Sequence, residues 1–193
     1  MRINLLIVVL ISFLFTGCLP HTRAYLPVSS SEKQALDRAN RNVYPDDVRN
    51  SLANYQNTLV VWPGIVLENK FIEHADQIEI QLILEHHYYD WFEDFSIQKE
   101  KIFLSPRGEG LFQTSLFIKK DANIEEMKKA AGVGNLIIVY GTPQQIKEDR
   151  SINLIYTYLR GIDKQWFTTI DICISNRNKL NWFHETPWDP STA

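Results

Sequence analysis

The sequence predicts a mainly β protein with one or two short helices: a small OB-like antiparallel barrel preceded by a signal peptide and a tether. Two observations support this fold class. The elements run as three or four strands, one clear helix and two or three further strands, which is the plan of a five- or six-stranded barrel with a helix in its middle connection. Residues 77–86 alternate between apolar and polar side chains, as a half-buried strand does. An open α+β sandwich is the alternative architecture.

Residues 1–17 have the layout of a lipoprotein signal peptide. Arg2 is the one charged residue before Cys18, an apolar run fills 3–15, and a Thr-Gly pair precedes the cysteine. Such a segment is too short for a spanning helix and is typical of a secretory signal. The residues before Cys18 resemble a bacterial lipobox, which implies cleavage before Cys18 and acylation of that residue. The alternative is an ordinary secreted protein in which this cysteine is incidental.

Composition limits the kinds of partner that this chain is expected to bind. The formal net charge is −3 and no cluster of Lys and Arg occurs, which argues against nucleic acid, because phosphate binding depends on clustered basic residues. Leu19 stands where an acidic residue resembles an inner-membrane retention signal, so we expect the outer membrane, with the domain facing the periplasm. The expected partners are that membrane, through lipid on Cys18, and other envelope proteins; no cofactor is expected.

The chain after the cysteine divides by composition. Residues 19–31 are rich in Pro, Ser and Thr and lack an apolar period, which is typical of an extended tether. A short helix is expected over 31–42, capped by Ser31 and ended by Pro45. The segments expected are the signal peptide 1–17, a lipid-anchored tether with short helices 18–54, the OB-like β-barrel domain 55–176 and an aromatic C-terminal tail 177–193.

Within the barrel domain, the first strand is expected over 58–67, with Pro63-Gly64 marking a bulge or a sharp bend. The clearest helix is 121–132, where Asp121 can cap, acidic residues fill the first turn and lysines the last. Prolines in the C-terminal tail argue against an element there. The remaining strands are expected over 77–86, 101–104, 111–118, 135–141, 153–160 and 166–174.

Several of these segments resemble one family. Tyr55 precedes the run 60–66, which contains Trp62-Pro63-Gly64, and a later apolar strand ends in Gly141-Thr142 before an aromatic tail. Together with the lipobox cysteine, these features resemble the Slp family of bacterial outer-membrane lipoproteins. The resemblance implies an envelope lipoprotein and carries no catalytic residues over to this chain.

Two groups of residues are candidates for chemistry or contact. His86, His87 and Asp90 are of types that bind zinc and similar ions, and they would share a face only outside a regular strand. A solvated loop is the simpler interpretation, so no metal is expected. Aromatic residues mark protein, glycan or membrane contacts when they are exposed. The candidates for such a contact are Tyr88, Tyr89, Trp91, Phe92, Trp182 and Trp188.

The sequence therefore favours a non-enzymatic outer-membrane lipoprotein that acts in cell-envelope maintenance or as an accessory subunit of an envelope complex. One alternative is a metal-dependent hydrolase that uses His86, His87 and Asp90. A second alternative is a glycan or small-ligand binding module that uses the barrel face and the loop 88–92.

Overall fold

The structure is a computed structural model that describes residues 25–89, 91, 102–120, 123–174 and 180–186. Five strands close into a barrel in the spatial order β1-β2-β4-β6-β5, and all neighbours are antiparallel except β4 and β6. The helix of the middle connection lies between β4 and β5, so the predicted OB-like barrel is confirmed. The barrel strands are β1 (Val60–Glu73), β2 (Gln77–His86), β4 (Leu111–Lys119), β5 (Leu136–Ile146) and β6 (Ile152–Ile162).

The barrel interior is filled by side chains. Along β2 every second residue points inward and is buried, as the alternation predicts. The largest fully buried rings of this interior cluster are those of Trp62 and Phe112, which meet edge to face with centroids 5.5 Å apart. A Cβ at Gly64 would lie 2.6 Å from Phe112 Cζ, so a glycine is required where this ring crosses β1. The interior is therefore a packed core.

Of the two features expected at Pro63-Gly64, the bulge is wrong. Both residues remain in register with β5, and the irregularity in β1 lies between Val66 and Glu68, in its pairing with β2. Pro63 has no N–H, but its carbonyl oxygen accepts a hydrogen bond from the His87 N–H at 3.1 Å. The glycine thus provides space for the Phe112 ring.

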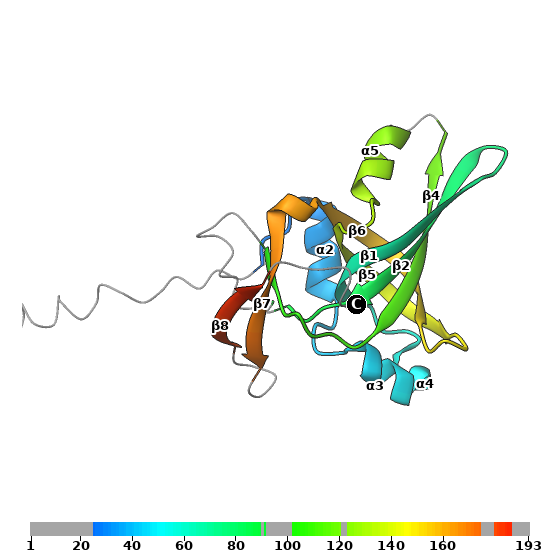
Figure 1. Cartoon of the computed structure of the whole chain (residues 1–193). Coiled ribbons are helices and arrows are strands. Elements are labelled where there is room, and N and C mark those ends of the chain that lie inside the picture. The colour runs from blue at the N-terminus through cyan, green and yellow to red at the C-terminus, as the bar shows by residue number, and fades with distance from the viewer. Residues whose placement is uncertain (1–24, 90, 92–101, 121–122, 175–179, 187–193) are drawn as a thin grey trace, which may run out of the picture.

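Helices lie at opposite sides of the barrel (Figure 1). On one side is α5 (Ile124–Ala130), whose N-terminus is capped by the Asn123 side chain; the expected cap, Asp121, lies outside the described residues. On the other are α3 (Pro45–Asn50) and α4 (Leu52–Tyr55). Pro45 begins α3, because a proline in the first turn needs no hydrogen-bonded N–H.

A second layer covers part of the barrel. It contains α2 (Ser30–Arg38) and a separate sheet in the order β3-β7-β8. Ser29 caps α2, two residues before the expected cap Ser31, and its hydroxyl accepts a hydrogen bond from the Glu32 N–H. The members of the sheet are β3 (Ile102–Leu104), β7 (Phe167–Ile174), which follows the short 3-10 helix η2 (Lys164–Trp166), and β8 (Leu180–Thr186).

This layer changes the expected segment boundaries. The barrel ends with β6, so the strand expected over 166–174 exists but belongs to the second sheet. The expected absence of an element in the tail is wrong, because β8 pairs with β7. Tyr25 is already buried, so the domain begins inside the segment expected to be a tether. Among the described residues, no helix is long and apolar enough to cross a membrane.

Candidate binding face

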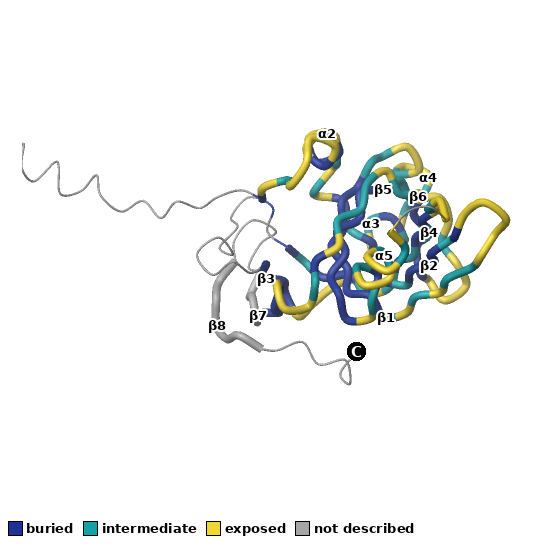
Figure 2. Tube along the Cα trace, turned by 90° about the horizontal axis from the view of Figure 1, so that it is seen from above, coloured by how far each residue is buried: buried dark blue, intermediate teal, exposed yellow. Residues whose placement is uncertain are grey.

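The outer surface of the barrel has two different walls. The first wall, β5 with the start of β1, turns apolar residues outward into a second core with α2, β3 and β7. The second wall, β2 with β4, turns polar residues outward, and their side chains remain partly exposed. In both views α2 lies on one side of the barrel and β2 and β4 on the other (Figures 1 and 2). We call these the covered wall and the open wall.

A groove of about 180 Å³ lies on the open wall, next to the start of β6. Its lining mixes carboxylate, ammonium, amide and hydroxyl groups, so it offers both donors and acceptors of hydrogen bonds. In OB-type barrels the face of the second and third strands binds oligonucleotides and oligosaccharides, and here those strands are β2 and β4. The polar side chains that line the groove include Glu68, Lys70, Gln81, Gln113, Ser115 and Lys147.

Neighbouring side chains hold the polar groups of this wall in place. The Gln81 amide donates to Glu79 Oε1 at 2.8 Å, and Lys147 Nζ donates to the amide oxygen of Gln113. Hydrogen bonds from Gln81 and Ser115 lower the pKa of the Glu79 carboxyl, so it stays ionised at neutral pH. The face is therefore an oriented set of hydrogen-bonding groups.

Phe117 adds an aromatic surface to the open wall. It lies on β4, opposite Glu79 of β2, and half of its surface is exposed (50%). The ring of His74 is tilted against it at a centroid distance of 6.4 Å. An exposed ring beside fixed polar groups suits a ligand with both apolar and hydrogen-bonding surfaces.

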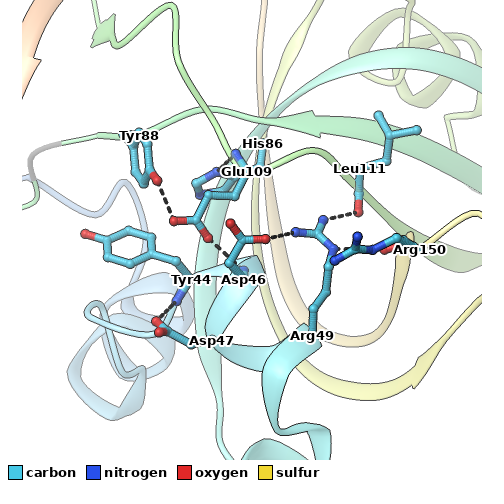
Figure 3. Close-up of polar contacts among 9 residues, drawn as sticks. All are labelled: Tyr44, Asp46, Asp47, Arg49, His86, Tyr88, Glu109, Leu111 and Arg150. Carbon is cyan, nitrogen blue, oxygen red and sulfur yellow. Dashed lines mark hydrogen bonds and ion pairs between the residues drawn. The ribbon is translucent and has the colours of Figure 1, made fainter.

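The end of the barrel beside α3 is closed by a polar network (Figure 3). The Glu109 carboxylate accepts hydrogen bonds from the Tyr88 hydroxyl and, at 2.7 Å, from the Asp46 N–H. Arg49 pairs with Asp46 at 2.6 Å and also donates to the carbonyl oxygens of Leu111 and Arg150. These contacts join α3 to Glu109 and Leu111 and to Arg150, and Glu109 also binds Tyr88, so the network connects four segments at this end of the barrel.

His86 lies beneath this network at the inward end of β2. Its Nδ1 accepts a hydrogen bond from the Glu109 N–H at 3.2 Å, while Nε2 has no hydrogen-bond partner among the described residues. Burial, together with electrostatic repulsion from His87 and Arg49, lowers the pKa of His86 to about 3. The imidazole is therefore neutral and packs between Trp62, Tyr44 and Tyr88.

The structure separates the two histidines proposed as metal ligands. His87 is also buried, but its Nδ1 bonds the Ser105 carbonyl oxygen at 2.8 Å and its Nε2 lies 3.6 Å from Glu85 Oε2. His86 faces the barrel end instead, and Asp90 lies outside the described residues. In the part of the chain that the structure describes, no three His, Cys, Asp or Glu side chains form a metal-ligand group.

The aromatic candidates are also distributed differently from the expectation. Tyr89 and Trp91 are buried in the second core, so they offer no exposed contact surface. Tyr88 is half-buried in the closing network. Trp182 lies in β8, and Phe92, Trp188 and the lipidation candidate Cys18 lie outside the described residues.

Sequence reasoning missed the residues that distinguish the two walls. The alternation of β2 predicts which of its polar residues face outward, but it does not predict which residues of β4 lie beside them. The burial of Glu32 could not be predicted from the sequence, because an acidic residue near the start of a helix is ordinarily exposed.

The fold and its open wall define the class: an OB-like barrel with a polar outer face. No protein-family model, curated protein or solved structure matches the chain.

Proposed function

We propose that this chain is a non-enzymatic outer-membrane lipoprotein, held by acyl chains on Cys18, that acts in cell-envelope maintenance or as an accessory subunit of an envelope complex. The layout of residues 1–18 supports this best, with one charge at Arg2, an apolar run over 3–15 and a Thr-Gly pair before Cys18. Tyr25, seven residues after Cys18, is buried in the domain. The acyl chains would then join a fully folded barrel to the membrane.

Membership in the Slp family is part of the proposal. The residues on which that resemblance depends have specific roles in the barrel. Gly64 leaves room for Phe112, and a Cβ at Gly141 would lie 2.9 Å from the carbonyl oxygen of Ile155. Trp62 fills the interior and donates from Nε1 to the Val43 carbonyl oxygen at 2.7 Å. Each of these three residues therefore contributes to the packing of the barrel.

The positions of the polar groups in the fold favour a binding role over catalysis. The interior is filled by side chains, and the cluster of Tyr88, Glu109, Asp46 and Arg49 joins segments of the chain to one another. The open wall keeps oriented polar groups at the surface. Binding at this wall would require no rearrangement of the core.

Metabolic labelling with a clickable palmitate analogue tests the anchor. We expect label on the wild type and on Cys173→Ser, none on Cys18→Ala, and the labelled protein in the outer-membrane fraction. The Cys173→Ser variant controls for acylation at the other cysteine. An unlabelled wild type would contradict the proposal.

A second candidate function is glycan binding at the open wall. The observation that favours it is the exposed Phe117 ring on the same wall as the polar groove, since sugars present apolar ring faces as well as hydroxyls. The acidic net charge disfavours an oligonucleotide as the ligand.

Titration of the detergent-solubilised protein with chitotetraose, followed by NMR, tests this second candidate. We expect chemical-shift changes in β2 and β4 that disappear in Phe117→Ala and persist in Trp166→Ala. Trp166 is a matched control, because it is similarly exposed (48%) but belongs to η2, which leads into the second layer. Changes that survive Phe117→Ala, or no changes at all, would count against a glycan site here.

A further inference from the structure

The first described residue is fixed firmly to the covered wall. The ring of Tyr25 makes edge-to-face contacts with Trp91 and Tyr89, at centroid distances of 5.2 and 5.8 Å. Its hydroxyl donates to Glu32 Oε1 at 2.5 Å and accepts from Arg160 Nη1 at 2.6 Å. Burial and the hydrogen bond to Glu32 raise the pKa of Tyr25, so it remains a neutral donor.

Glu32 extends this attachment into the barrel. Its side chain is fully buried and also accepts hydrogen bonds from the Val28 N–H at 2.7 Å and the Tyr140 hydroxyl at 3.1 Å. Because Tyr140 belongs to β5, the N-terminal segment, α2 and the barrel share one polar cluster. The chain therefore emerges from the domain at a defined point on the covered wall.

The distance from this point to the proposed anchor is short. Seven residue steps separate Cys18 from Tyr25, and an extended chain covers at most about 3.6 Å per step, or about 25 Å in total. A domain of this size is about 40 Å across, as its expected radius of gyration of about 15 Å implies. The tether is therefore shorter than the domain is wide, which keeps the covered wall nearer to the membrane.

Two apolar side chains lie beside the attachment point. Leu26 and Val28 lie between Tyr25 and Glu32, and their backbones are hydrogen-bonded to Arg160 and Glu32, yet 59% and 66% of their surfaces are exposed. Single exposed apolar residues are ordinary in soluble domains. Here they lie one and three residues after Tyr25, where the short tether would bring them to the lipid surface.

We infer that, in the acylated protein proposed above, the surface carrying Leu26 and Val28 rests on the bilayer that holds the Cys18 anchor. The open wall then faces away from that bilayer. This inference depends on the proposed lipoprotein function and adds to it an orientation and a lipid-contact surface. The groove on β2 and β4 would be accessible to partners in the periplasm.

Fluorescence quenching in vesicles tests the orientation. Val28→Cys and Phe117→Cys, each in full-length acylated protein that also carries Cys173→Ser, are labelled with NBD and reconstituted in phosphatidylethanolamine and phosphatidylglycerol. We expect a nitroxide-labelled lipid to quench the probe at 28 several-fold more than the probe at 117. Equal quenching at the two positions would overturn the inference.

A longer tether provides the second arm. A Gly-Ser insert of about 24 residues after Pro20 adds a flexible span of roughly 27 Å, and we expect it to reduce the difference between the two probes. A difference that the insert leaves unchanged would show that the short tether does not set the orientation. Palmitate labelling of the same samples separates the failures: unlabelled wild type removes the lipoprotein proposal, whereas labelled protein with equal quenching removes only the orientation.

Discussion

The covered and open walls show how one barrel supports two kinds of surface. On β5 the outward residues Leu136, Ile138 and Tyr140 are as deeply buried as the inward ones, whereas outward residues of β2 such as Gln81 stay partly exposed. A strand buried on both faces is apolar throughout, and a strand buried on one face alternates. The outward residues therefore decide which wall packs against a second layer and which remains open to a ligand.

A carboxylate on each wall makes the contrast specific. Glu32, on α2 against the covered wall, is fully buried and accepts from the Tyr25 and Tyr140 hydroxyls and the Val28 N–H. Glu79, on the open wall, accepts from the Gln81 side-chain amide at a partly exposed position. The two walls should therefore respond very differently to the loss of a carboxylate.

Glu32→Ala should have the largest effect. Removing the buried carboxylate leaves the Tyr25 and Tyr140 hydroxyls without their acceptor and the Arg160 guanidinium without its ion-pair partner. We expect the free energy of unfolding to fall by about 3 to 5 kcal/mol. Urea denaturation measures this, with Glu79→Ala as the matched control that should scarcely move the midpoint. Similar losses in the two variants would erase the distinction between the walls.

The sequence predicts the barrel strands better than the second layer, because the strands show local patterns and the layer does not. The alternation in β2 and the apolar run in β5 are local patterns, so the strands, their order and the intervening helix could be predicted. The second layer depends on contacts between distant segments, such as the parallel pairing of β3 with β7. No local period indicates that Tyr25 packs against Tyr89 and Trp91, so the sequence alone does not predict that these two side chains are buried.

The candidate site shows the same limit. The outward polar residues of β2 follow from its period, but the groove also needs the register that places Ser115 of β4 opposite Gln81. The adjacent histidines suggested a shared site by their spacing alone. In the fold His86 ends an inward-facing row and His87 leaves the strand, so sequence adjacency sends them to different partners.

His86 at the barrel end and His74 beside the open wall should differ in their effect on the pH dependence of stability. The pKa of His86 falls from its ordinary value near 6.5 to about 3 on burial, so the unfolded chain binds a proton that the folded protein excludes. Stability is therefore complete above about pH 6.5 and falls as the pH drops below it, by roughly 1 kcal/mol per pH unit. Urea unfolding between pH 7.5 and 5 measures this slope before most carboxylates titrate.

His86→Leu should reduce that slope, and His74→Gln should leave it in place. His74 is the suitable control because it lies beside the open wall with its ring partly exposed and paired with Glu79. The leucine variant will be less stable at every pH, because the Glu109 N–H loses its acceptor, so the slope is the informative quantity. An unaltered slope in His86→Leu would assign the acid sensitivity to other groups.

The smallest expected effects come from deleting one polar group on each wall. Tyr140→Phe removes a hydroxyl that donates to Glu32 in the buried cluster, and we expect a loss of about 1 kcal/mol. Gln81→Ala removes an amide from the open wall, and the change should stay within about 0.5 kcal/mol, as at most surface positions. If Gln81→Ala cost as much as Tyr140→Phe in urea denaturation, the open wall would be stabilising the barrel as well, and its polar groups would no longer be free to favour a ligand.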